Sequence, residues 1–270
     1  MSPAGKERAV KRAKSGQVQS LSRAFQLLMR LSQDEAGYTL SELASLEHLP
    51  PSTVHRLLNS MRQLGFTEFD EPRGVWGVGI NAFRCGNTYL KKRDFIAQSR
   101  AVMKRLVAQT GETSNLGVLR DGEVVFVGQV ECQAVMRMVV SVGSCGPIHA
   151  SGVGKAMLSA LPMAEALQLL GQKGMQPLTP RTLTRKAQFS DELRTIRLRG
   201  YAVDDEEQTE GLRCIAANIY DEFGMALAAL SISGPTVRVQ QQRVEALGAQ
   251  VVAAADEITR LIGGCRPEGQ

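Results

Sequence analysis

The chain has 270 residues, more than one typical domain needs and enough for two. Hydrophobic residues make up 43% and charged residues 22%, as in an ordinary globular protein, and the absence of an apolar run of about 18 residues excludes a membrane-spanning helix. The first twenty residues lack the apolar stretch of a secretory signal, and the five cysteines are scattered without a CxxC pair. We therefore expect a cytoplasmic protein with free thiols, no structural zinc site and no membrane partner.

Positive charge is concentrated in the first third of the chain. Residues 1–93 carry 14 Lys and Arg against 8 Asp and Glu, whereas residues 94–270 carry 18 against 19. The excess is densest in residues 1–17, which we predict to be a basic flexible tail. Such a tail beside a basic domain is typical of a protein that binds a polyanion such as DNA, but also of a solvated leader, so charge alone leaves both interpretations open.

Residues 18–80 carry the periodicities of a winged helix-turn-helix domain. Apolar residues at intervals of three and four predict three successive helices. Thr39 and Glu42 have the spacing of a capping box at the start of the second helix, Pro51 lies at the start of the third, and Gly65 is a natural stop for it. Alternation around a Pro/Gly turn then predicts a short hairpin. Three helices followed by a hairpin are the element order of this DNA-binding domain.

The third helix, which begins at Pro51 or Ser52, buries an apolar stripe and therefore turns a polar face outward. That face carries side chains of the kind that contact base edges and phosphates, and the candidate DNA-binding residues are Ser52, Thr53, His55, Arg56 and Asn59. Arg56 is the best candidate for a base contact, while Ser52 and Thr53 suit a phosphate at the helix start. A helical bundle whose polar face is only solvated is the alternative.

A linker helix over 81–95 is expected to lead into a larger domain over 96–265. In that domain helical and strand patterns alternate, which predicts a two-domain protein of the α/β class. After a long helix over 96–109, strands are expected near 113–119, 124–130, 135–142, 201–204, 214–220 and 226–231. Helices are expected near 154–160, 164–170, 191–199 and 237–262.

The start of one of these helices can hold an anion. The chain enters a helix near Ser151, which leaves the N–H groups of Ser151, Gly152 and Val153 without intrahelical acceptors. Gly152 lets a ligand approach the backbone closely, because it has no side chain. Such a helix start suits a carboxylate, although helix starts of this composition are also common in ordinary packing.

Polar residues on the predicted strands can complete the same site. Ser231 and Ser233 are two residues apart, so both hydroxyls face one side of the sheet. Asp204 can accept a hydrogen bond from a ligand hydroxyl or a hydrated aldehyde. Cys214, in an apolar strand, is a compact wall residue with a polarizable sulfur. Packing alone is the alternative role for each of them.

Six stretches of the chain resemble the IclR family of bacterial transcriptional regulators. They are SRAFQLL at 22–28, LSELA at 40–44, PSTVHRLL at 51–58, PIHASGVGKA at 147–156, GLRCIAA at 211–217 and ALSISGP at 229–235. The resemblance extends over about residues 18–262 in the order found in the family. It implies a winged helix-turn-helix domain and a GAF-like α/β effector-binding domain. It also implies double-stranded operator DNA as a partner and a homodimer or dimer of dimers, held partly through the helix at 81–93.

Within the family, further stretches are similar to glyoxylate-responsive members, at 111–113, 128–132, 136–138, 149–152 and 203–207. This similarity implies glyoxylate or a similar 2-oxo acid as effector. The residues it implies in contact with that effector are Ser151, Gly152, Val153, Asp204, Cys214, Ser231, Ile232 and Ser233. Arg213 and Val153 depart from the pattern, since a glyoxylate-responsive member has asparagine and alanine there. Pyruvate or another small carboxylate therefore stays an alternative effector.

The sequence favours a transcriptional repressor and not an enzyme. Cys214 with His149 suggests a GAF-type thiol enzyme, but no evident base lies near Cys214, and an inert core cysteine is the commoner case. We expect no catalytic residue, no metal ligand and no cofactor other than the small effector. An architectural DNA-binding protein with a vestigial sensor is a third possibility, which predicts salt-sensitive binding with little sequence preference.

Overall fold

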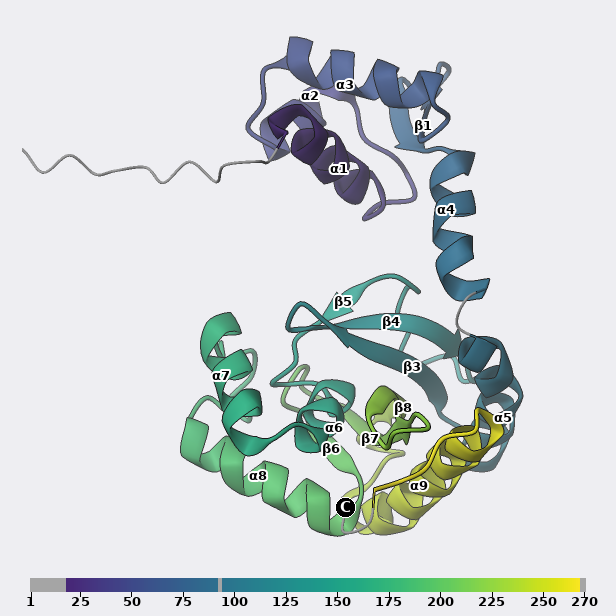
Figure 1. Ribbon diagram of the computed structural model, residues 1–270, viewed down its shortest axis with the longest axis vertical. Helices are drawn as coiled ribbons and strands as arrows, with labels where there is room; N and C mark the ends of the chain where they lie inside the picture. The colour runs from purple at the N-terminus through teal and green to yellow at the C-terminus, as the bar shows by residue number, and fades with distance from the viewer. Residues whose placement is uncertain (1–17, 92–93, 268–270) are drawn as a thin grey trace, which may run out of the picture. The chain divides into compact units, whose positions relative to one another are not determined.

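Figure 1 shows the computed structural model, which describes residues 18–91 and 94–267 and, for 87–91 and 94, the backbone alone. The basic tail expected over 1–17 lies outside the described residues. The chain divides into two compact units at residue 91, and each is described by itself.

The first unit contains three helices, a hairpin and a fourth helix. They are α1 (Gln19–Leu31), α2 (Leu40–Leu46), α3 (Pro51–Gln63), β1 (Thr67–Asp70), β2 (Val75–Val78) and α4 (Ile80–Lys91). The two strands pair in antiparallel fashion, with Phe69 opposite Trp76. The predicted winged helix-turn-helix is confirmed in both its elements and their order.

Local signals set the helix ends of this unit. The Thr39 hydroxyl accepts a hydrogen bond from the Glu42 amide at 3.3 Å, and the Glu42 carboxylate accepts one from the Thr39 amide at 2.8 Å. This reciprocal capping box starts α2. After α2 the chain turns through His48, which has a left-handed φ of 51°. Pro51 then occupies the first turn of α3, where a missing N–H costs nothing.

The core of this unit joins the helices to the wing. The backbone groups of Trp76 and Tyr38 bond to each other at 3.1 and 2.8 Å, which ties the hairpin to the loop between α1 and α2. The buried residues that pack together are Leu27, Leu31, Leu43, Ala44, Val54, Leu58 and Trp76.

The second unit is built on one six-stranded sheet in the order β5-β4-β3-β8-β7-β6, and every neighbouring pair is antiparallel. Its strands are β3 (Thr113–Arg120), β4 (Glu123–Val130), β5 (Cys145–Gly146), β6 (Ala202–Asp205), β7 (Leu212–Tyr220) and β8 (Ala226–Pro235). Its helices are α5 (Asp94–Thr110), α6 (Gly152–Ala160), α7 (Met163–Lys173), α8 (Lys186–Arg199), η1 (Gln241–Arg243) and α9 (Val244–Leu261).

Helices cover both faces of this sheet (Figure 1). Helices α5 and α9 pack on one face, where Ile215 and Ile232 meet Val251 of α9 in a shared core. Helices α6, α7 and α8 pack on the other face. There the strands present Ala216 and Ala229, whose small side chains let α6 lie close to the sheet.

The prediction of a strand over 135–142 is wrong. Residues 131–144 form bends and irregular backbone, and Val135 is 98% exposed. The β-branched residues of this stretch favour a strand only where they pack on a half-buried surface, and most of them lie outside the core. The Met136 carbonyl instead accepts a hydrogen bond from Arg238 at 2.9 Å. Two smaller differences concern element ends: β8 extends to Pro235, and α9 begins at Val244, after η1, instead of at 237.

Candidate functional site

The start of α6 has the free backbone donors that the sequence predicts. Ser151 is the N-cap residue, and its hydroxyl accepts a hydrogen bond from the Gly154 amide at 3.1 Å while it donates one to the Pro147 carbonyl at 2.7 Å. The hydroxyl is therefore already used within the protein. The amide of Val153 has no acceptor among the described residues, and that of Gly152 faces the Cys214 sulfur. The ligand-facing groups of this turn are thus backbone N–H groups.

Two glycines allow α6 to approach the sheet this closely. A Cβ on Gly152 would lie 2.9 Å from the Cys214 sulfur and 3.5 Å from the Ala216 side chain. A Cβ on Gly154 would overlap the backbone of Ile148. Both positions are therefore restricted to glycine by close packing, with ordinary negative φ angles.

The polar strand residues form two neighbouring rows on the face that α6 covers. Asp204 lies opposite Cys214, which lies opposite Ser233, which lies opposite Thr113. In the next row Ser231 lies between Ala216 and Asn115. Because residues directly opposite one another point to the same side of a sheet, the side chains of each row lie together.

The sulfur of Cys214 is the centre of this cluster. It is surrounded by polar groups that affect the pKa of its thiol: the hydroxyls of Ser233 and Ser231, the amide of Gly152 and the carboxyl of Asp204. Burial, and after it the nearby Asp204 charge, raises the pKa of the Cys214 thiol to about 11. The residue is therefore a neutral thiol near pH 7, which suits a wall residue and not a nucleophile.

Asp204 is buried with 1% of its surface exposed. Its Oδ1 accepts hydrogen bonds from the amides of Glu207 at 2.8 Å and Gln208 at 3.3 Å. Burial raises the pKa of Asp204 to about 7, against the lowering effect of the amide bond from Glu207.

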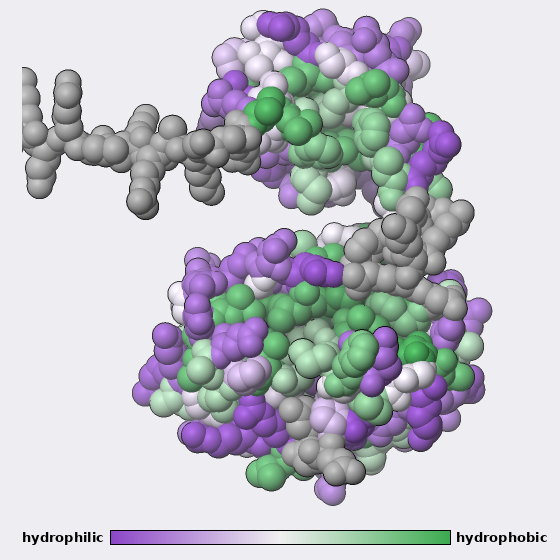
Figure 2. All heavy atoms as spheres, in the orientation of Figure 1, coloured by the Kyte–Doolittle hydropathy of each residue, from purple (hydrophilic) through white to green (hydrophobic). Residues whose placement is uncertain are grey.

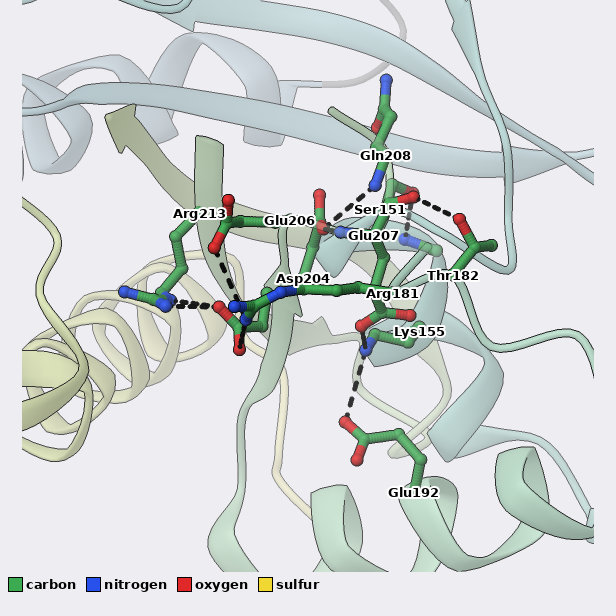
Figure 3. A network of polar contacts seen from close by, with 12 residues as sticks. Ser151, Lys155, Arg181, Thr182, Glu192, Asp204, Glu206, Glu207, Gln208 and Arg213 are labelled. Atoms are coloured by element: carbon green, nitrogen blue, oxygen red, sulfur yellow. Dashed lines mark hydrogen bonds and ion pairs between the residues drawn. The ribbon is translucent and has the colours of Figure 1, made fainter. Parts of the chain in front are cut away.

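A buried ion network lies next to Asp204 (Figure 3). The Lys155 ammonium is 1% exposed, bonds to the Glu207 carboxylate and lies 3.4 Å from Glu192. Glu192 also accepts a hydrogen bond from Arg199 at 3.0 Å. Because Glu207 binds Asp204 through its amide and Lys155 through its carboxylate, the network joins α6 and α8 to the end of β6 that carries Asp204.

The structure places seven of the eight expected effector-site residues at this junction of α6 with β6, β7 and β8. The exception is Ile232, whose side chain points to the opposite face into the core with α9. Arg213 also lies away from the site, because its guanidinium bonds to Asp205 at 2.8 Å and to the Val239 carbonyl. The departure at Arg213 therefore does not change the groups that face the site.

Sequence reasoning missed Asn115, which lies on the site face beside Ser231. Its Nδ2 group donates to the Ser233 hydroxyl at 3.4 Å, and its Oδ1 accepts from Gln129 at 2.9 Å. Gln129 therefore fixes the orientation of the Asn115 amide. The available signal was a run of three polar residues, Thr113–Asn115, at the start of a predicted strand, whose depth only the structure shows.

The predicted DNA-binding face of α3 is exposed. Ser52, His55 and Arg56 are exposed, and Thr53 and Asn59 are half-buried. The buried residues of the same helix are Val54 and Leu58. The Arg56 guanidinium makes no hydrogen bond or ion pair to a described residue. The Asn59 amide donates to the His55 carbonyl at 3.0 Å, so it is partly committed within the helix.

Two kinds of site are absent from the residues that the structure describes. They contain no group of three or more His, Cys, Asp or Glu placed to hold a metal ion. None of the described helices is both long and apolar enough to span a membrane.

Residues 20–71 match the family model described as the IclR helix-turn-helix domain, and residues 87–260 match that of the bacterial transcriptional regulator IclR C-terminal domain. The chain is 43% identical to the acetate operon repressor of Salmonella typhimurium (strain LT2), over 93% of both proteins. It is 36% identical to the HTH-type transcriptional repressor AllR of Escherichia coli (strain K12), over 91% of this chain and 90% of AllR.

Solved structures give the same assignment. An IclR homolog from Microbacterium hydrocarbonoxydans, complexed with 4-hydroxybenzoate, has a TM-score of 0.77 and 25% identity, over 89% of this chain and 98% of that one. The acetate operon repressor is more similar in sequence to this chain than AllR is, so overall identity does not single out one effector. Two family models that together span most of the chain, and relatives of matching length, show what kind of protein this is. The chain is a DNA-binding transcriptional regulator, not an enzyme, and it belongs to the IclR family.

Proposed function

We propose that this regulator is a repressor whose affinity for operator DNA is controlled by a small 2-oxo acid such as glyoxylate. The observation that carries the proposal is Ser231. Its hydroxyl belongs to a fully buried residue and makes no hydrogen bond of ordinary geometry to a described residue; the Cys214 thiol, a weak acceptor, is the polar group near it. It lies on the face of the sheet that meets the free N–H groups of α6. A buried unsatisfied hydroxyl costs about 1–3 kcal/mol, which a bound ligand would recover.

The groups around Ser231 suit an acid of this kind. The amides at the start of α6 favour a carboxylate, with the partial positive charge of the helix start behind them. Ser231, Ser233 and Asn115 offer donors for a carbonyl or hydrate oxygen on the next carbon. The close approach of Gly152 to Cys214 favours a ligand of few atoms. The presence of 4-hydroxybenzoate in a relative's structure supports a carboxylate as the chemical class.

The DNA-binding half of the proposal rests on α3 and on a second copy of the chain. Arg56 and its neighbours on α3 would contact the operator. Apolar side chains gather on the surface beside α1 (Figure 2), among them Leu21, Phe25 and Met29, and α4 exposes Ile80 and Phe83. We propose a homodimer or dimer of dimers that covers part of this surface, which places two α3 helices on a palindrome-like operator.

The experiment that tests the proposed effector is calorimetric titration of the purified protein with glyoxylate, with pyruvate and acetate as controls. Saturable binding of glyoxylate, together with weaker operator binding in its presence, is the expected result. Tighter binding of pyruvate would support a regulator that responds to a 2-oxo acid, but with pyruvate as its effector instead of glyoxylate. If none of the three acids binds, the assignment of a 2-oxo acid as effector is refuted.

A further inference from the structure

Asp204 lies where an anionic effector would bring a second negative charge. It is on the same face as Cys214 and Ser233, and the Cys214 sulfur that it faces also meets the amide of Gly152 at the start of α6. A carboxylate bound at the α6 amides would therefore be separated from the Asp204 carboxyl only by the side chain of Cys214. Two carboxylates that share a buried site are strongly disfavoured unless one of them holds a proton.

The two oxygens of Asp204 have different surroundings. Oδ1 accepts hydrogen bonds from the amides of Glu207 and Gln208. Oδ2 makes no hydrogen bond to any described residue. A proton on Oδ2 would leave both amide bonds to Oδ1 intact, and it would turn Oδ2 into a donor.

The charged groups that face Asp204 do not balance a second anion. Lys155 approaches from α6, Glu207 from the turn after β6 and Cys214 from β7, while β8 contributes only the neutral Ser233. The Lys155 ammonium is already bonded to Glu207 and lies close to Glu192, so its one positive charge faces two carboxylates. Among the described residues, this leaves the start of α6 as the source of positive charge for an effector, and a helix start is equivalent to only about half an elementary charge, which does not balance two anions.

We infer that, where Asp204 is ionised in the free protein, binding of each effector molecule is accompanied by uptake of one proton, so that Asp204 faces the bound acid as a neutral carboxylic acid. The inference rests on the proposed effector site. The step is a binding equilibrium: the anion enters, Asp204 gains a proton from solvent, and the net charge of the complex equals that of the free protein with Asp204 ionised. Asp204 is then a sensor of pH within the effector site.

The expected pH dependence follows from the free protein. Burial raises the pKa of Asp204 to about 7, so the group is mostly protonated at pH 6 and mostly ionised at pH 8.5. If only the protonated form binds, the effector affinity is nearly level below pH 6 and falls about thirtyfold between pH 6 and pH 8.5. Burial also raises the pKa of Glu207, and the charge of Lys155 opposes this, so the test must separate the two acids.

The test is calorimetric titration of the full-length protein with glyoxylate between pH 6 and pH 8.5, in pairs of buffers with different ionisation enthalpies. The wild-type protein should lose about thirtyfold in affinity across this range and take up about 0.8 proton per glyoxylate at pH 7.5. Asp204→Asn keeps an oxygen for the two amides and a donor on the other atom. It should therefore bind with the low-pH affinity of the wild type at every pH, without proton uptake.

Asp191→Asn is the matched control, because Asp191 is an exposed carboxylate on α8, and it should behave as the wild type. A wild-type affinity that does not change with pH would overturn the inference and leave the proposed effector standing. An equal pH dependence in Asp204→Asn, or loss of its glyoxylate binding while circular dichroism shows it folded, would also overturn the inference. Absence of glyoxylate binding by the wild type at every pH would instead refute the effector proposal, and the inference with it.

Discussion

Asp204→Asn should make the stability of the sensing domain much less dependent on pH. The pKa of Asp204 is about 7 in the fold against an ordinary value of 3.8, so the folded state binds this proton more tightly than the unfolded chain does. The stabilisation from that proton is complete below about pH 4 and is lost as pH rises through 7. Integrated from pH 5 to pH 8, the loss is about 3 kcal/mol for this one group.

Urea unfolding of the full chain between pH 5 and pH 8, followed by circular dichroism, measures this loss. Trp76 is the only tryptophan and lies in the core of the DNA-binding unit, so its fluorescence follows that unit separately. The asparagine variant should exceed the wild type in stability at pH 8, and the difference should shrink toward pH 5, while the Trp76 transition stays unchanged. Asp191→Asn should keep the wild-type slope. Parallel pH profiles for wild type and Asp204→Asn would show that Asp204 is ionised across this range and refute the reasoning.

Three further predictions test other parts of the structure. Arg56→Ala should weaken operator binding about tenfold or more, measured by fluorescence anisotropy, while glyoxylate affinity stays unchanged; loss of both would contradict the division into two domains. Lys155→Met leaves the buried Glu207 without its cation, while Glu192 keeps Arg199, and it should destabilise the sensing domain by about 3–5 kcal/mol in urea unfolding at pH 8; an unaltered midpoint would mean that the network is not formed. Gly154→Ala should destabilise the sensing domain in thermal unfolding, because the added Cβ would overlap the Ile148 backbone. Gly86→Ala on α4, where the Cβ would meet open space, is the control and should be neutral or stabilising by up to about 1 kcal/mol. Equal effects of the two substitutions would contradict the close packing of α6.

The DNA-binding unit could be predicted closely because its signals are local. A capping box needs residues three apart, and a helix stripe repeats within one or two turns, so neither depends on a distant segment. The hairpin follows in the same way from its turn residues. The structure starts α2 at the predicted capping box and α3 at Pro51, and it forms the hairpin around the predicted Pro/Gly turn.

The grouping of residues in the candidate effector site could be predicted only in part, for the opposite reason. Its helix start and the pair Ser231 and Ser233 are local features, whereas the placement of Asn115 beside them depends on the register between β3 and β8, which are far apart in sequence. Ile232 was expected from the family resemblance, although the same alternation that pairs the two serines turns its side chain to the other face.

The strand expected over 135–142 shows the remaining limit. Its apolar, β-branched pattern is the one that a strand has, but a strand also needs a neighbouring backbone. The edge of β4 is instead occupied by Cys145–Gly146. Which segment reaches that edge is decided by how the chain returns from β4 toward α6, and no periodicity within 135–142 contains that information.

Proton uptake at Asp204 has a consequence for repression that differs from an effect of pH on DNA binding itself. An effector that binds more tightly at low pH weakens operator binding at a lower effector concentration there. By linkage, the effector concentration that is needed falls by the same factor by which the effector affinity rises. A direct effect of pH on operator binding would instead act whether or not effector is present. The two effects therefore separate in a single experiment. Operator affinity is measured across pH with and without glyoxylate. In Asp204→Asn the difference between the two curves should no longer depend on pH, while the curve without glyoxylate keeps the wild-type shape.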